Sequence, residues 1–69
     1  MMTKNEILNI YFGMAFTAEN YQKWLEKPNL KKEDIEEITS ILNIYNKKLA
    51  KMEDENTWIA NVLIAMEGN

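Results

Sequence analysis

The side chains of this 69-residue chain that could take part in chemistry are mainly carboxylates, and most of them fall in two clusters. The clusters are Glu33, Asp34, Glu36 and Glu37 near the middle of the chain, and Glu53, Asp54 and Glu55 further on. Paired carboxylates can bind a cation or transfer protons, but neither cluster has the Asp-x-Asp-x-Asp-Gly order of a calcium loop. We interpret the first cluster as a solvated surface at the positive end of a helix, or as a contact for a partner rich in lysine or arginine.

The residues needed for most other chemistry are missing. The chain has no cysteine, which excludes disulfides and zinc–thiolate sites, and no histidine, the commonest metal ligand and general base. Ser40 is the single serine and has no histidine to activate it, and the two glycines, Gly13 and Gly68, form no phosphate-binding loop. The sequence therefore predicts a protein that is not an enzyme and that holds no metal or cofactor.

The charge and hydropathy of the chain narrow the class of partner. All eight basic residues are lysine, and eleven acidic residues bring the net charge to −3. Because proteins that bind nucleic acid usually carry a basic face with arginine side chains, we do not expect direct nucleic-acid binding. No segment has the ~20 apolar residues of a membrane span. Asn9 and Gly13 interrupt the N-terminal apolar stretch, which does not resemble a signal peptide, so we expect a cytoplasmic protein without membrane contact.

A first helix is expected over residues 3–26. Thr3 and Glu6 have the Thr-x-x-Glu spacing of a capping box at its start. Its apolar residues recur at spacings of three and four, which places them on one stripe: Ile7, Tyr11, Met14, Ala18, Tyr21 and Leu25. Trp24, at its end, is typical of a residue that closes a core. Gly13 lies in the middle, and Thr17 has the surroundings of an N-cap, so a kink or restart near Thr17 stays open.

A second helix is expected over residues 30–52, after the break at Lys27-Pro28-Asn29, with Asn29 as its N-cap. Its stripe has the same spacing and consists of Ile35, Ile38, Leu42, Tyr45, Leu49 and Met52. Two stripes of matched length on either side of a tight turn predict an antiparallel helical hairpin.

Residues 53–56 are expected to connect this hairpin to a short C-terminal helix over residues 57–67. The result is an all-α, three-helix domain spanning residues 1–69. However, Ile59, Leu63 and Met66 also continue the heptad phase of the second helix. One unbroken helix over residues 30–66, with Asn56 at a core position, is therefore the alternative.

Leu8, Phe12 and Phe16 form a second apolar surface on the first helix. They lie about 100°, 140° and 180° around the helix from the main stripe, so a two-helix hairpin would leave them exposed. We expect the third segment or a second subunit to cover them, or a different protein to bind them. In the latter case Glu33, Glu36 and Glu37 would form an acidic rim.

The C-terminal helix is apolar on nearly every side, with Asn61 and Glu67 as its polar positions. Because a chain this short has few other residues to cover such a helix, we expect a homodimer that completes the core. The residues expected at the self-association surface are Trp58, Ile59, Val62, Leu63 and Met66. The alternative is a compact monomer with this helix at its centre. Ile44, on the far side of the second helix, is a further hint of an interface.

The matched hairpin resembles small homodimeric helix-hairpin proteins such as the plasmid copy-number regulator Rop. The resemblance is one of architecture and covers no functional motif. RNA binding would need a basic face that this chain lacks, and is not carried over.

These features predict a non-catalytic, acidic regulator or inhibitor that binds a host protein stoichiometrically and occludes its working surface. Small chains rich in Asn, Lys and Ile and without Arg are typical of AT-rich coding, as in phages and mobile elements of low-GC bacteria. A structural or scaffolding subunit of a larger assembly, and an acidic mimic of nucleic acid, are the alternatives.

Overall fold

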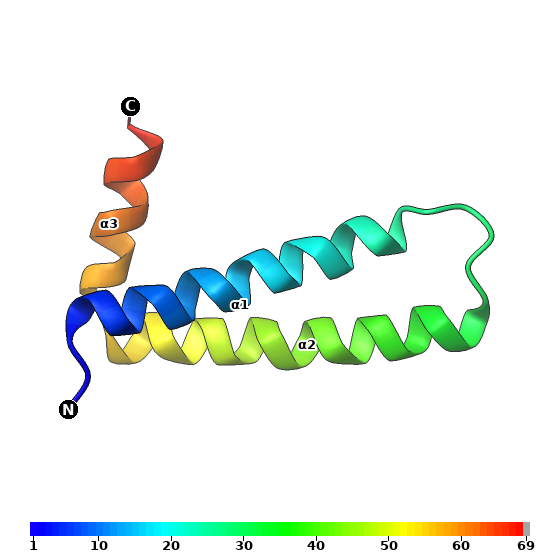
Figure 1. Cartoon of the computed structure of the whole chain (residues 1–69), viewed down its shortest axis with the longest axis horizontal. Coiled ribbons are helices and arrows are strands. Elements are labelled where there is room, and N and C mark those ends of the chain that lie inside the picture. The colour runs from blue at the N-terminus through cyan, green and yellow to red at the C-terminus, as the bar shows by residue number, and fades with distance from the viewer. Residues whose placement is uncertain (69) are drawn as a thin grey trace.

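The computed structural model describes residues 1–68, which form three α-helices and no strand (Figure 1). The helices are α1 (Lys4–Leu25), α2 (Lys32–Glu55) and α3 (Trp58–Glu67). The predicted all-α class and the three-helix order are confirmed. Asn69, the last residue of the expected domain, lies outside the described residues.

α1 begins with the predicted capping box. The Thr3 hydroxyl accepts a hydrogen bond from the Glu6 N–H at 3.2 Å, and the Glu6 carboxylate accepts one from the Thr3 N–H at 3.2 Å. The helix then runs unbroken to Leu25, so a restart at Thr17 is wrong. The Thr17 hydroxyl caps nothing, because it donates to the Gly13 carbonyl one turn earlier at 2.8 Å.

The turn between α1 and α2 differs from the prediction in the role of Asn29. This residue has a φ of 69°, in the left-handed region that asparagine tolerates better than most residues, and so reverses the chain. The N-cap of α2 is Lys31, whose side chain makes no capping hydrogen bond. The prediction that Asn29 caps α2 is therefore wrong, and α2 begins at Lys32, with Glu33 and Asp34 in its first turn.

α1 and α2 lie side by side and make the main tertiary contact (Figure 1). The buried residues of their seam are Ala18, Ile38 and Leu42, with Tyr21, Leu25 and Tyr45 packed against them. All six belong to the two predicted stripes, whose other members are buried or half-buried with one exception. Ile35 is 43% exposed, because α2 extends past the end of α1 at the turn (Figure 1).

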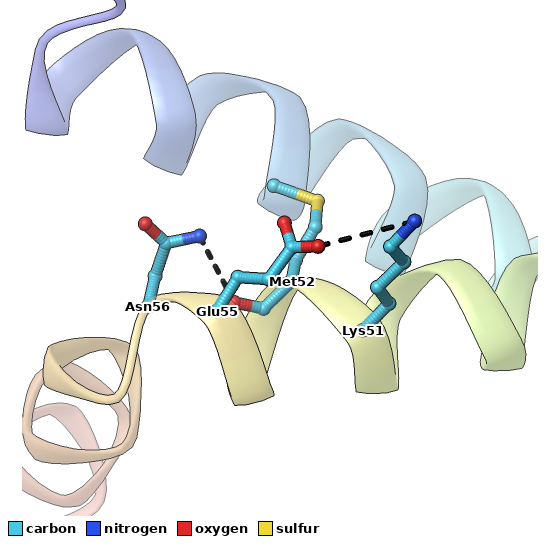
Figure 2. Close-up of polar contacts among 4 residues, drawn as sticks. All are labelled: Lys51, Met52, Glu55 and Asn56. Atoms are coloured by element: carbon cyan, nitrogen blue, oxygen red, sulfur yellow. Dashed lines mark hydrogen bonds and ion pairs between the residues drawn. The ribbon is translucent and has the colours of Figure 1, made fainter.

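Asn56 ends α2 and separates it from α3 (Figure 2). Its backbone N–H and its side-chain amide both donate to the Met52 carbonyl, at 2.9 and 3.0 Å, and its own carbonyl accepts from the Ile59 N–H at 2.9 Å. These bonds close the last turn of α2 and open the first turn of α3. The single helix over residues 30–66 is therefore wrong. The expected polar connection is also shorter than predicted, since residues 53–55 belong to α2.

α3 turns away from the hairpin beside the first turn of α1 and projects on the side of α1 opposite α2 (Figure 1). Lys4 Nζ lies 5.2 Å from the centre of the Trp58 ring, and Ile59 is fully buried. The described body measures 41 × 30 × 16 Å with a radius of gyration of 14.4 Å, against about 11 Å for a compact domain of this length. A compact monomer with α3 at its centre is therefore not the observed arrangement.

Within the described residues, no helix combines the length and apolar character that a membrane span needs.

Candidate functional site

The outer patch, which consists of Leu8, Phe12 and Phe16, runs along α1 at intervals of four residues. Leu8 and Phe12 are half-buried, whereas Phe16 is 66% exposed. Phe16 lies opposite the buried stripe of α1, so its ring faces away from α2. Of the three predicted residues, Phe16 therefore offers a partner the most apolar surface.

Tyr11 supports the outer patch from inside the hairpin. It is 6% exposed, and its ring meets the Phe12 ring edge-on with centroids 5.6 Å apart. Its hydroxyl donates to the Glu53 carboxylate of α2. Burial raises the pKa of the Tyr11 phenol above its ordinary value of 10.0, and the charge of Glu53 and this hydrogen bond raise the pKa further. Tyr11 thus fixes α1 against the end of α2 and holds Phe12 in place.

The Tyr11–Glu53 contact predicts a loss of stability at high pH. The folded pKa of Tyr11 is raised, so its contribution is fully present below pH about 10 and is lost as pH rises through the folded pKa. We expect the urea midpoint of the wild type to fall between pH 8 and pH 11. In Tyr11→Phe the midpoint should fall less, because this variant has no phenol at position 11 to ionise. The fall that remains comes from lysine deprotonation, which is common to both proteins. Urea unfolding followed by circular dichroism measures both falls, and equal falls would contradict the prediction.

The acidic rim lies away from the outer patch. Glu33, Glu36 and Glu37 are exposed in the first turns of α2, at the turn end of the hairpin, and Glu37 shares a groove with Trp24. Along α1, Trp24 is about 12 Å from Phe16 and about 24 Å from Leu8, at 1.5 Å per residue. The patch and the acidic residues are thus two separate features.

The residues predicted for self-association are largely used by the chain itself. Ile59 is 0% exposed and has no surface left for a second subunit, and Trp58, Val62 and Leu63 are half-buried. Met66 is 60% exposed, because α3 extends beyond the hairpin (Figure 1). Ile64 on the opposite side of α3 is 65% exposed and was not predicted.

A groove between α1 and α2, of about 300 Å³, is a feature that the sequence did not predict. Its lining residues come from both helices and are Tyr21, Trp24, Asp34, Glu37, Ile38 and Ile41. The Trp24 and Tyr21 rings stack, with centroids 6.2 Å apart and planes 10° apart. Trp24 remains 48% exposed, so the prediction that it closes the core is wrong. Trp24 instead forms one wall of an open surface, and Ile10, about 40° from it around α1, is also 44% exposed.

Among residues 1–68, no three carboxylates come close enough together to hold a metal ion. Comparisons of the chain with protein-family models, with curated proteins and with solved structures give no match.

Proposed function

We propose that this chain is a non-catalytic regulator or inhibitor that binds another protein through the outer side of α1 and occludes that protein's working surface. The observation that carries the proposal is the exposure of Phe16, at 66%, on the side of α1 that faces away from α2. Large aromatic side chains are enriched among the residues that dominate protein–protein binding. Phe12 and Leu8, half-buried along the same line, extend the apolar strip.

The proposal differs from the sequence-based mechanism in one respect. The acidic residues Glu33, Glu36 and Glu37 do not border the outer patch, so the proposed contact with the partner is apolar. Ile64 and Met66 of α3, exposed by 65% and 60% on opposite sides of that helix, are further apolar side chains outside the hairpin.

Self-association is the second part of the proposal. A compact monomer of 8.1 kDa exposes about 4,500 Å², whereas this chain exposes 5601 Å². The excess of roughly 1,100 Å² is larger than the ~800 Å² that each partner buries in a standard interface. This surplus, together with a body only 16 Å thick, supports a homodimer as the functional unit.

The test of partner binding uses Phe16. A photo-crosslinking amino acid at position 16 should capture one host protein, which is then purified and titrated with the wild type by calorimetry. Phe16→Ser should weaken this binding by about thirtyfold or more, because the aromatic anchor is lost, while thermal unfolding stays unchanged. Lys47→Ser, at an exposed position of α2, is the matched control and should bind as the wild type does.

Equal affinity of Phe16→Ser and wild type for the purified partner would refute the outer patch as the binding surface. A structural subunit of a larger assembly is the alternative favoured by the small buried core of Tyr11, Ala18, Ile38, Leu42 and Ile59. That alternative predicts a chain that is molten or aggregates when purified alone.

A further inference from the structure

α2 carries a second line of residues beside its buried stripe. The line has spacings of three and four and consists of Asp34, Glu37, Ile41, Ile44, Lys48 and Lys51. At 100° per residue it lies about 90° around the helix from the stripe that faces α1. Its charged members are exposed, Ile41 is half-buried, and Ile44 is 54% exposed. Asp34, Glu37 and Ile41 line the groove beside Trp24, which places this line on the groove face of the hairpin.

The order of charges along this line is acidic, apolar, basic. The centre lies between Ile41 and Ile44, with Glu37 as far before it as Lys48 is after it. Asp34 and Lys51 are likewise equidistant from the centre. The line is therefore complementary to itself when turned end for end. An antiparallel copy would place Glu37 opposite Lys48, Asp34 opposite Lys51, and Ile41 opposite Ile44.

We infer that two copies of this chain pair through this line, with α2 antiparallel to α2 of the second copy about a two-fold axis between Ile41 and Ile44. A two-fold interface uses the same surface on both chains, which must be self-complementary in charge and in apolar position. The inference rests on the self-association part of the proposed function and identifies the surface that performs it. This surface differs from the α3 surface that the sequence predicts, of which Ile59 is already fully buried in its own chain.

The charged residues of the line are available for such contacts. The ion pairs within residues 1–68 are Lys23–Glu19 and Lys51–Glu55. Asp34, Glu37 and Lys48 therefore have no ionic partner among the described residues. The Lys51–Glu55 pair is long, at 3.9 Å between exposed groups, and contributes little to stability (Figure 2). Lys51 can exchange it for Asp34 of the second copy at small cost.

The neighbouring surface of α1 fits the same arrangement. Trp24 lines the groove, and Ile10, about 40° from Trp24 around α1, is also partly exposed. A methyl group in place of the Gly13 hydrogen would meet no neighbouring side chain within 4 Å, which leaves room for a side chain of another molecule. Two hairpins joined face to face make a four-helix bundle, in which these apolar residues become buried. The outer patch and Phe16 stay free for a different protein.

The test is a charge exchange measured by sedimentation equilibrium over a wide concentration range. Glu37→Lys and Lys48→Glu should each raise the dimer dissociation constant about tenfold or more, because each places two pairs of like charges across the two-fold axis. The double variant E37K/K48E restores both attractive pairs and should dimerise as the wild type does. An equimolar mixture of the two single variants should form a heterodimer, because both of its pairs are attractive.

Glu36→Lys is the matched control, since it makes the same charge change in the same helical turn but lies 100° away from the line. It should dimerise like the wild type. A monomer mass for the wild type at every concentration would refute self-association itself. A stable dimer that Glu37→Lys weakens no more than Glu36→Lys, or that the double variant does not restore, would overturn this surface while leaving the dimer in place.

Discussion

Ile59→Ala is expected to release α3 from the hairpin. Ile59 is 0% exposed, so its truncation removes buried apolar contacts and leaves a cavity, at a cost of about 2–5 kcal/mol. α3 has 10 residues, fewer than the ~12–15 that an isolated helix needs in water, so it should unfold once it is undocked. Hydrogen exchange should show loss of protection for the amides of residues 62–66, while those of residues 38–45 in α2 remain protected.

Ile64→Ala is the control for this prediction. It makes the same substitution in the same helix, at a side chain that is 65% exposed, and should leave the protection of α3 unchanged. Trp58 fluorescence in a Trp24→Phe background offers a second measure of α3 docking, because Trp58 is then the one tryptophan. Wild-type protection of α3 in Ile59→Ala would show that α3 is anchored by other contacts.

Leu42→Ala is expected to unfold most of the molecule. Leu42 is 7% exposed and packs in the seam with Ala18 and Ile38. Its truncation costs about 2–5 kcal/mol, which is comparable with the ~3–5 kcal/mol that the core of so small a domain supplies. Circular dichroism at 25 °C should therefore show a large loss of helix. The loss should be partly reversed at high protein concentration, because the proposed dimer would stabilise the folded chain by mass action.

Asn43→Ala is the matched control for Leu42→Ala. Asn43 is the next residue, is exposed, and alanine is the better helix former. This variant should have an unchanged or slightly raised urea midpoint at the same protein concentration. A Leu42→Ala protein with a wild-type midpoint would mean that the seam between α1 and α2 is not what stabilises the hairpin.

The helices and their inward faces were largely predictable because their signals are local. A capping box spans four residues, and a stripe of apolar residues needs a few turns of one helix. Thr3 and Glu6 therefore indicated the start of α1, and the residues that line the seam, Ile38 and Leu42 among them, were predicted from their spacing. Phe16 was found exposed for the same reason, because a position opposite the stripe faces away from the neighbouring helix.

The predictions that failed concern residues whose role depends on backbone geometry or on distant neighbours. Asparagine is common both in the left-handed position of a turn and at the N-cap of a helix. The distance along the sequence from Asn29 to the apolar stripe of α2 does not distinguish these two roles. Asn56 suited both the end of a helix and a core position within one long helix. The structure has the first arrangement because Ile59 is buried against the hairpin, and this burial needs α3 to turn aside. Trp24 was expected inside a core because it stands at the end of its helix beside Leu25, but its exposure depends on how α2 packs, which its own helix does not reveal.

The sequence by itself determined the helical class, the hairpin seam and the charge order along α2, because each of these depends on spacing within one helix. The tertiary structure decided which apolar residues remain outside. It buried Ile59, which the sequence had assigned to a second subunit, and left Trp24, Ile44 and Phe16 exposed on two different faces. The physical reason is that the exposure of a side chain depends on the segments packed over it. In α3, the exposure of each side chain follows from two features. The hydrogen bonds of Asn56 end α2 at that residue, and Ile59 is buried against the hairpin.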